Sequence, residues 1–400
     1  MAPGRFRGKR VLFASHKLNL SGVGGHMMTL TRGLQARQWE VGIVARELDA
    51  GTPMGREWFE AAGVTLFQAP FPLYGLTAAN ARAAAETLAA LDRIVHRFRP
   101  ELLHVHAPTL CPWAGIVGWR HEIPTVSTLH LETLGPNKVR LARLGSRLLP
   151  KAFGQSTIAI STDMARLLVD GLGLPRRRVR TIMHGVDDER FRPPTPAERA
   201  DARRAFGLGD ADRVVCTIAV LEERKGHALL IAALAALRQR GIDVVALCAG
   251  AGTDADRRRI EHQARESGVA DRIRLLGHGD SRRVMWASDA SVLLSTTEGF
   301  GLVIVESMLC GLVPLRTPSA GASDQIVDGK TGFIVPFGDD RALAERLQTL
   351  FTDRELARRM SEAAHGYARS RFTRRVMAEQ TEAVYLDAIR QRAPRILPFV

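Results

Sequence analysis

Two glutamates stand eight positions apart in a segment that is otherwise mostly apolar. The segment 295–311 reads STTEGFGLVIVESMLCG and carries Glu298 and Glu306. Carboxylates are rarely buried without a partner, because the loss of hydration is costly unless another polar group replaces the water. These two side chains are therefore expected to face a polar ligand.

The glutamates border a strand, a short loop and the start of a helix. The strand-like run 290–296 precedes the loop, and a helix is expected from about Leu302 to Cys310. The first amides of a helix have no partner within it and carry the positive end of the helix dipole, which suits phosphate. Gly299 and Gly301 let a ligand approach that backbone closely. A sugar nucleotide has a matching layout, with a diphosphate between a sugar and a ribose.

Short apolar runs alternate with helical patterns along the chain, and a proline-rich break at 190–200 divides them into two series. The runs are 10–15, 40–46, 101–107, 124–130 and 156–161 before the break, and 213–220, 243–250, 272–278, 290–296 and 312–317 after it. Continuous apolar strands that alternate with helices indicate parallel sheets covered on both faces. The sequence therefore predicts two doubly wound α/β domains, and the tail 361–393 is expected to form a helix.

Residues that could bind a ligand cluster at the carboxyl ends of these runs, where doubly wound sheets bind ligands. A loop with Gly22, Gly24 and Gly25 is expected after the first run of the first series, and His130 ends a later run of that series. Lys225 lies shortly after the first run of the second series. Because tight turns use glycine routinely, the glycine loop is weak evidence when taken alone.

Three other histidines are less clearly linked to the site. His104 and His106 alternate along one run, and we expect them to face opposite sides of the sheet, so that only one could line a site. His104 is interpreted as a structural histidine. His184 is interpreted as part of the structure between the domains.

Several motifs together resemble those of retaining glycosyltransferases with the GT-B fold, and the chain is similar to glycosyltransferase family four over nearly its full length. The segment EGFGLVIVE matches the family pattern of two glutamates separated by seven residues. The other matching segments are the N-terminal glycine loop, HGVDDERFRP at 184–193, LEERKGHALLIAAL at 221–234, the run that ends in LLGH, and IVDGKTGFIVPFGDD at 326–340. The combination is specific, whereas each segment alone is not.

The resemblance implies roles for individual residues. Glu298 would contact the transferred sugar, Glu306 would hold the ribose hydroxyls, and His130 would lie beside the reacting carbon. Lys225 would contact the donor diphosphate, where an ammonium offsets the charge that builds on the leaving nucleotide. The remaining donor-site residues implied by the resemblance are Gly22, Gly24, Gly25, Arg224, His278, Phe300, Gly301, Leu302 and Val303.

One position departs from the family pattern. The family usually carries an arginine a few residues before the lysine, whereas this chain has Val220 in that region. Three outcomes are open: Arg224 or another cation takes over the phosphate contact, donor binding is weaker, or the protein is not a transferase.

The resemblance also implies an architecture of two Rossmann-like domains that face each other across a cleft. The expected parts are an acceptor-binding domain at 1–189, a donor-binding domain at 190–375, and a C-terminal helix and tail at 376–400 that return to the first domain.

The implied activity is retaining transfer of a hexose from a UDP- or GDP-sugar to a hydroxyl acceptor, in the synthesis of a glycan, a glycolipid or a small glycoside. The donor is a substrate, and neither a cofactor nor a metal is expected. Two alternatives are an inactive homologue that binds nucleotide sugars as a scaffold and a sugar-nucleotide epimerase of similar fold.

The formal charge of +14 fits nucleic acid, an anionic membrane or phosphorylated ligands. The basic residues are spread along the chain without aromatic interleaving or a nucleic-acid motif, so nucleic acid is the weakest of the three. A basic amphipathic segment at 137–151 is interpreted as an ordinary helix, which leaves peripheral contact with an anionic membrane open. The oligomeric state is not predicted.

Neither a long apolar span nor a signal-peptide pattern is present, so a cytoplasmic location is expected. The four cysteines have no paired spacing and are expected to be reduced thiols in the core. Two Asp-x-Asp pairs, Asp210/Asp212 and Asp254/Asp256, are interpreted as caps of backbone amides rather than metal ligands.

Overall fold

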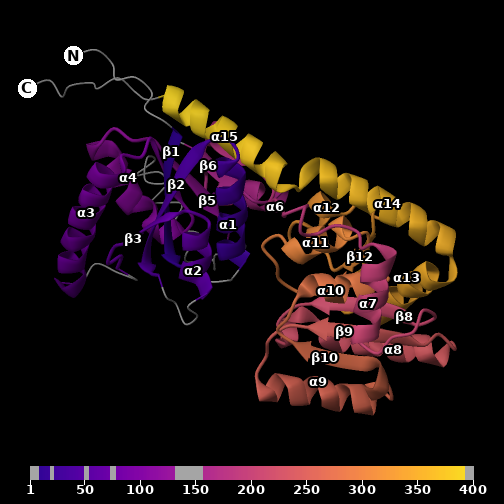
Figure 1. Ribbon diagram of the computed structural model, residues 1–400. Coiled ribbons are helices and arrows are strands. Elements are labelled where there is room, and N and C mark those ends of the chain that lie inside the picture. The colour runs from indigo at the N-terminus through magenta and orange to yellow at the C-terminus, as the bar shows by residue number, and fades with distance from the viewer. Residues whose placement is uncertain (1–8, 19–21, 49–53, 73–77, 131–155, 392–400) are drawn as a thin grey trace, which may run out of the picture. The chain divides into compact units, whose positions relative to one another are not determined.

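The computed structural model describes residues 9–18, 22–48, 54–72, 78–130 and 156–391 (Figure 1). The chain divides into two compact units, Met1–Gly185 together with Arg374–Val400, and Val186–Thr373. Each unit is built on its own parallel sheet flanked by helices, so the predicted class of two Rossmann-like α/β domains is confirmed. The basic segment 137–151 lies outside the described residues.

In the described part of the N-terminal unit, seven strands form one parallel sheet in the order β3-β2-β1-β4-β5-β6-β7. The strands are β1 (Lys9–Lys17), β2 (Trp39–Glu47), β3 (Thr65–Gln68), β4 (Leu102–Val105), β5 (Thr125–Leu129), β6 (Ser156–Ala159) and β7 (Val179–Thr181). The strand order reverses between β1 and β4, and this reversal is the topological switch point at which such sheets bind ligands.

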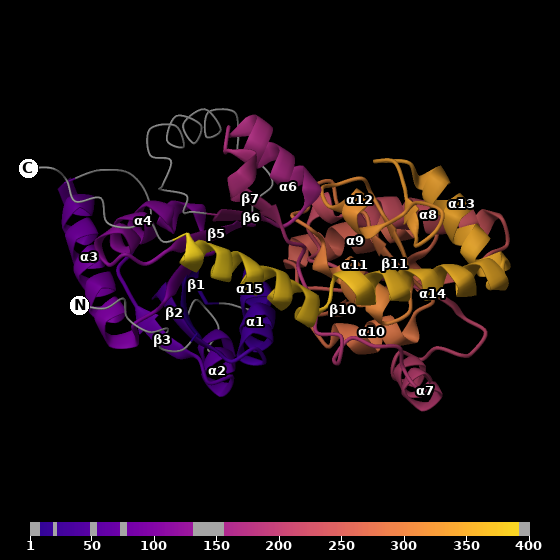
Figure 2. The same ribbon diagram turned by 90° about the horizontal axis from the view of Figure 1, so that it is seen from above.

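Helices cover both faces of this sheet (Figures 1 and 2). They are α1 (Gly22–Gln35), α2 (Met54–Ala61), α3 (Ala78–Phe98), α4 (Cys111–Arg120), α6 (Thr162–Arg166) and α15 (Arg374–Arg390). Side chains alternate along β1: Val11 and Phe13 join the core shared with α1 and α15, whereas Leu12 and Ala14 join the core under α3 and α4. This alternation explains why β1 is apolar throughout.

A buried carboxylate attaches α15 to the N-terminal unit. Glu382 accepts hydrogen bonds from Lys9 Nζ at 2.8 Å and from Trp39 Nε1 at 2.9 Å, and it also pairs with Arg37. Burial alone would raise the pKa of Glu382, but the hydrogen bonds from these three residues hold it below its usual value. The carboxylate is therefore ionised at neutral pH and links α15 to β1, to the turn after α1 and to β2.

The described C-terminal unit has six strands in one parallel sheet, in the order β10-β9-β8-β11-β12-β13. The strands are β8 (Arg213–Ile218), β9 (Val244–Ala249), β10 (Ile273–Gly277), β11 (Ala290–Leu293), β12 (Val313–Arg316) and β13 (Phe333–Ile334). The helices are α7 (Pro196–Ala205), α8 (His227–Gln239), α9 (Asp254–Glu266), α10 (Ser281–Ala287), α11 (Leu302–Leu309), α12 (Ala322–Gln325), α13 (Asp340–Thr352) and α14 (Arg354–Arg371). Here the switch point lies between β8 and β11.

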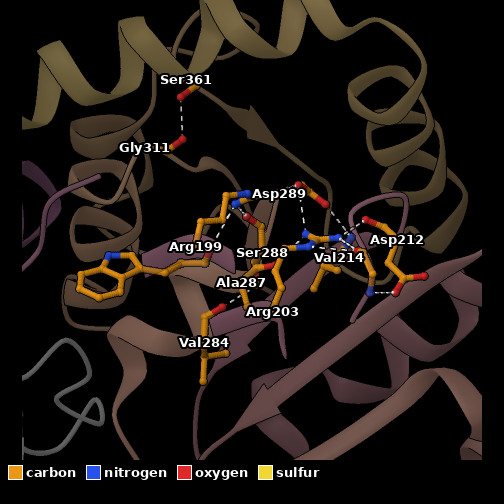
Figure 3. Close-up of polar contacts among 12 residues, drawn as sticks. Arg199, Arg203, Asp212, Val214, Val284, Ala287, Ser288, Asp289, Gly311 and Ser361 are labelled. Carbon is orange, nitrogen blue, oxygen red and sulfur yellow. Dashed lines mark hydrogen bonds and ion pairs between the residues drawn. The ribbon is translucent and has the colours of Figure 1, made fainter. Parts of the chain in front are cut away.

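Two arginines of α7 hold the entry to β11, as Figure 3 shows. Arg199 donates to the carbonyl oxygen of Ser288 at 2.8 Å and pairs with Asp289 Oδ1 at 2.5 Å. Arg203, which is buried, donates to the carbonyl oxygen of Ala287 at 3.0 Å. These bonds satisfy the backbone between α10 and β11, and so fix the start of the strand that leads to the candidate site.

The tail differs from the single helix expected at 361–393. The helical path stops after α14 and restarts with α15, because Phe372 is buried and its carbonyl oxygen accepts a hydrogen bond from Val186 N at 2.7 Å. Thr373 also forms an isolated bridge with Val186. All four cysteines are buried with free thiols, as expected. Within the described ranges, no helix combines the length and apolarity that a bilayer crossing requires.

We expect Glu382→Gln to lower the free energy of unfolding of the N-terminal unit by about 1–3 kcal/mol, because three donors lose an ionised acceptor. The matched control is Asp387→Asn on the same helix, whose half-exposed carboxylate pairs only loosely with Arg180 and should matter by less than about 1 kcal/mol. Because the folded pKa of Glu382 is depressed, its contribution is present above the unfolded pKa and disappears as the pH falls through the folded pKa. Urea unfolding at pH 7 would measure the change in the free energy of unfolding. An equal decrease in both variants would contradict the proposed role of Glu382.

Candidate active site

An ion pair joins the ends of the two central strands of the C-terminal unit. Lys225 follows β8 and Glu298 follows β11, and Lys225 Nζ lies 2.5 Å from Glu298 Oε1. Only 12% of the lysine side chain and 13% of the glutamate side chain are exposed. The pair therefore stands at the switch point of the sheet, with opposite charges that compensate each other out of bulk water.

Two backbone contacts bring these loops together. The amide of Thr296 donates to the carbonyl oxygen of Arg224 at 2.9 Å. Gly226 has a φ of +75°, and a Cβ on it would lie 2.4 Å from the carbonyl oxygen of Leu294. A side chain at this position would collide with β11's exit, so glycine permits the approach that places Lys225 beside the glutamate.

The loop after Glu298 ends at the start of α11. Gly301 is the N-cap of this helix with a φ of +76°, a left-handed conformation that favours glycine. Leu302 and Val303 occupy the first turn, whose amides point out of the helix start with no partner within the helix. Phe300 is 2% exposed, so its side chain packs in the core and only its backbone remains for a ligand. This helix start can receive an anion through its amides.

Glu306 lies in the second turn of α11 and is partly buried. Burial raises the pKa of its carboxyl to about 7, although the nearby Arg190 acts in the opposite direction. Among the described residues, no hydrogen bond offsets this loss of hydration. A carboxylate in this state is suited to accept hydrogen bonds from ligand hydroxyls.

Arg316 organises the same loops and was missed from the sequence. It closes β12, is fully buried, and donates to the carbonyl oxygens of Phe300 at 3.1 Å and Ala320 at 3.1 Å. It also donates to Ser319 Oγ at 2.9 Å and to the side chain of Gln325. The sequence shows an arginine at the end of an apolar strand, which could have indicated this role. Its acceptors are mostly backbone carbonyls, however, and these cannot be recognised from residue types.

Two other residues predicted for the donor site form no hydrogen bond with the ion pair of Lys225 and Glu298. Arg224 is exposed and its guanidinium pairs with Glu222 at 2.6 Å. His278 is exposed after β10, and β9 separates that edge strand from β8. Val220 is among the exposed large apolar residues. The structure thus brings Lys225 and Glu298 together but leaves Arg224 and His278 outside that pair's hydrogen bonds.

The histidines of the N-terminal unit correct one expectation. The rings of His104 and His106 lie 4.1 Å apart between centroids, so the expectation that they face opposite sides of the sheet was wrong. Side chains two positions apart along a strand share a face. His104 bonds to Thr128 Oγ1 at 2.7 Å and to the hydroxyl of Tyr385, which satisfies both ring nitrogens and supports its structural interpretation.

His130 lies just after β5 within a cluster of imidazoles. Its Nε2 is 3.3 Å from Nδ1 of His106, and its ring centroid is 4.9 Å from that of His26 and 5.3 Å from that of His184. Burial lowers the pKa of His130 to about 4, so the ring is neutral at pH 7. His26 was not predicted as a member of this cluster, although it directly follows the glycines after the first strand.

The three glycines near the N-terminus were expected in a loop, but Gly22, Gly24 and Gly25 form the first turn of α1. The residues 19–21 before them lie outside the described part. A Cβ added at Gly22 or Gly25 would meet nothing within 4 Å. Space at these two glycines therefore leaves this helix start accessible at the switch point of the N-terminal sheet.

The Asp-x-Asp pairs serve the backbone. Asp212 accepts from the amide of Gly209 at 2.7 Å. Asp256 forms a capping box with Thr253 at the start of α9, and Asp254 occupies the same first turn. The contacts of Asp212 and Asp256 agree with the interpretation of these pairs as caps.

Comparison with protein families supplies the assignment. The model described as Glycosyltransferase Family 4 matches residues 20–190, and the model described as Glycosyl transferases group 1 matches residues 198–366. The chain belongs to the family 4 glycosyltransferases with the GT-B fold. The two matches together span nearly all of both units, and they confirm the resemblance drawn from the motifs.

This glycosyltransferase is similar to curated relatives over most of its length. It is 29% identical over 365 residues to a D-inositol 3-phosphate glycosyltransferase of Geodermatophilus obscurus, covering 84% of this chain and 78% of the relative. It is 25% identical over 312 residues to N-acetyl-alpha-D-glucosaminyl L-malate synthase of Bacillus anthracis, covering 75% and 78%.

Solved structures share the fold of this glycosyltransferase. HepE of Anabaena, in complex with UDP and glucose, matches with a TM-score of 0.79 at 20% identity, over 95% of this chain and 100% of HepE. Sucrose-phosphate synthase of Thermosynechococcus elongatus matches with a TM-score of 0.75 at 21% identity, over 96% and 100%.

We expect Arg316→Lys to lower the free energy of unfolding of the C-terminal unit by about 2–4 kcal/mol, because an ammonium cannot reach the spread of acceptors that the planar guanidinium serves. The control is Arg341→Lys, an 82% exposed side chain in an i,i+4 pair with Glu345, with an expected change below about 0.5 kcal/mol. Denaturant unfolding followed by circular dichroism would measure both. A variant at Arg316 as stable as the control would contradict this role.

We expect Glu306→Gln to stabilise the C-terminal unit in a pH-dependent way. The folded pKa is about 7 and the ordinary value is 4.5, so the folded state holds its proton more tightly. Wild-type stability therefore declines relative to the variant between pH 4.5 and 7, and the gap reaches about 1–3 kcal/mol above that window. Melting curves from pH 4 to pH 8.5 would test this, with the exposed Glu261→Gln as a control that should show no such trend.

Proposed function

We propose that this glycosyltransferase moves a sugar from a nucleotide diphosphate sugar to a hydroxyl acceptor with retention at the anomeric carbon. The observation that carries the proposal is the buried ion pair of Lys225 and Glu298 beside the open amides of α11. The ion pair brings a cation from the loop after β8 next to a carboxylate that can accept hydrogen bonds from sugar hydroxyls, and this carboxylate precedes the anion-binding start of α11 by a few residues.

Each part of the donor would contact a different one of these groups. Its diphosphate would accept hydrogen bonds from the amides of Leu302 and Val303 and would pair with Lys225. Glu298 would then exchange its lysine partner for sugar hydroxyls. Glu306 would accept the hydrogen bonds of the ribose hydroxyls, which would favour its ionised form and draw its raised pKa down.

The transfer step would be a front-face displacement through an oxocarbenium-like state. The bond from the anomeric carbon to the phosphate oxygen breaks, and the bond to the acceptor oxygen forms on the same face. The acceptor proton passes to the departing phosphate oxygen, so no protein nucleophile is needed. Lys225 and the amides of α11 stabilise the negative charge that grows on the nucleotide. In the N-terminal unit, His130 would hydrogen-bond to a sugar hydroxyl without acting as a base.

The comparisons support parts of this proposal. The structure of HepE contains UDP and glucose, which favours a uridine nucleotide as the donor. The name of the relative from Geodermatophilus obscurus points to a phosphorylated polyol, a small-molecule class of acceptor. A glycan or glycolipid acceptor remains an alternative, and we retain the cytoplasmic location and contact with an anionic membrane as predictions from the sequence.

A second candidate function is a nucleotide-sugar scaffold without transferase activity. It is favoured by Val220, which stands where the family usually has a phosphate-binding arginine, and by the pairing of Arg224 with Glu222. The epimerase alternative gains nothing from the family assignment. Measurements of nucleotide binding and of turnover distinguish the transferase from the scaffold.

The test is a thermal-shift screen with UDP, GDP, ADP and their common sugars, because a ligand of the native state raises the melting temperature. One base should stabilise the wild type, and Lys225→Gln should weaken its binding by about 10–100-fold through loss of a charged hydrogen bond. The exposed Lys330→Gln is the matched control and should bind like the wild type. Acceptor-dependent nucleotide release and the anomeric configuration of the product would then be measured by NMR.

Two results would count against the proposal in different ways. Nucleotide binding without acceptor-dependent release, over the small-molecule and lipid acceptors tried, would favour the scaffold. Absence of binding by any nucleotide to a folded protein, or equal binding by the Lys225 and Lys330 variants, would overturn the assignment of the donor site.

A further inference from the structure

Three histidines of the N-terminal unit converge from separate elements. His26 lies on α1, His106 follows β4 and His130 follows β5. One ring nitrogen of each lies within 4.8 Å of one ring nitrogen of both others. The cluster stands at the carboxyl edge of the sheet, beside the switch point between β1 and β4.

The ring nitrogens of this cluster are poorly satisfied. His26 is 5% exposed and His106 is 3% exposed. Within the described chain, both nitrogens of His26, Nε2 of His106 and Nδ1 of His130 have no hydrogen-bond partner. Buried polar atoms are normally hydrogen-bonded, and each one left without a partner costs about 1–3 kcal/mol. His26 in particular is a buried ring without a hydrogen-bond partner at either nitrogen, which indicates a ligand for it in this cluster.

The spacing of the nitrogens suits a metal ion. Nδ1 of His106 lies 3.3 Å from Nε2 of His130. Two imidazoles bound tetrahedrally at about 2.0–2.1 Å from Zn²⁺ hold their ligand atoms about 3.3 Å apart. A proton shared between these two rings would also fit that distance, but it would leave His26 without any function in the cluster. An ion held through one nitrogen of each ring gives His26 a partner and replaces the contact between His106 and His130.

We propose that His26, His106 and His130 form a binding site for Zn²⁺ that links α1 to the ends of β4 and β5. Imidazole is a preferred ligand of this metal, and three protein ligands leave a fourth position for water or an anion. The site is separate from the Asp-x-Asp pairs and departs from the expectation that the protein binds no metal. It shares His130 with the proposed sugar contact, so an ion on Nε2 would leave only Nδ1 of that ring for a sugar hydroxyl, but Zn²⁺ binding itself can be measured without the transferase reaction.

Neighbouring rings hold the ligands in place. His184 stacks on His26 with centroids 4.2 Å apart. Phe13 packs its edge against His106 with centroids 4.8 Å apart. Such outer contacts orient metal-binding imidazoles and exclude competing water, which strengthens metal binding.

The first experiment measures metal binding by the full chain after removal of metal with a chelator. Zn²⁺ should bind with a stoichiometry of one and should raise the melting temperature, because it binds the folded state. Co²⁺ in the same site should give the intense visible absorption of tetrahedral nitrogen coordination. Competition with a chromophoric chelator gives the affinity.

Two variants test the ligands, and one serves as the control. His26→Phe keeps an aromatic ring that can stack on His184, and His106→Asn keeps a polar side chain of smaller size. Each should weaken Zn²⁺ binding by at least about 100-fold, since a three-ligand site loses one ligand. His262→Asn changes a 63% exposed histidine on α9 and should leave binding and melting unchanged.

The proposal is overturned if the folded wild type binds no stoichiometric Zn²⁺, or if His26→Phe binds it as tightly as His262→Asn. Circular dichroism melts establish that the variants are folded. Should both ligand variants fail to fold, X-ray absorption of the wild-type zinc protein decides. Three imidazole ligands support the site, and fewer than three contradict it.

Discussion

The close approach of the loops after β8 and β11 governs the arrangement of the C-terminal unit's site. Because Gly226 carries no side chain, its backbone can rest against Leu294, and the lysine that precedes it then meets Glu298. Both charges give up much of their hydration and depend on each other for compensation. A bound diphosphate would offer the lysine a stronger partner, so ligand binding in this unit is an exchange of ion pairs rather than the filling of a neutral pocket.

The same edge carries other charges whose hydration is reduced. Arg316 has its guanidinium surrounded by carbonyl oxygens, which fixes the loops before α11 and α12 while its positive charge remains. Glu306, one turn into α11, has no comparable set of donors among the described residues. The hydrogen-bonding groups of the arginine are therefore already paired within the protein, whereas the carboxylate of Glu306 can still accept hydrogen bonds. Arg316 thus shapes the site, and Glu306 can bind a ligand.

Sequence patterns predicted the central strands well, because β8 and β9 are continuous apolar runs that both sheet faces bury. The strands β3, β7 and β13 were not predicted, since they are edge strands of only two to four residues, too short to show a pattern. Lys225 and Glu298 were expected together because both follow central strands. The histidine cluster was not, because its assembly depends on the helix α1 meeting the loops after β4 and β5 in space. The expectation for His104 and His106 was wrong because strand periodicity was misapplied: residues two positions apart along a strand share a face.

The attachment of α15 has a consequence for synthesis on the ribosome. The helix that carries Glu382 belongs to the N-terminal unit but is made after the entire segment Val186–Thr373. Until then, Lys9, Arg37 and Trp39 lack their shared acceptor, and the apolar face of α1 lacks its cover. Domains generally fold in the order in which they emerge. Here the second unit can complete its core first, and the nascent first unit stays open to chaperones until the final helix arrives.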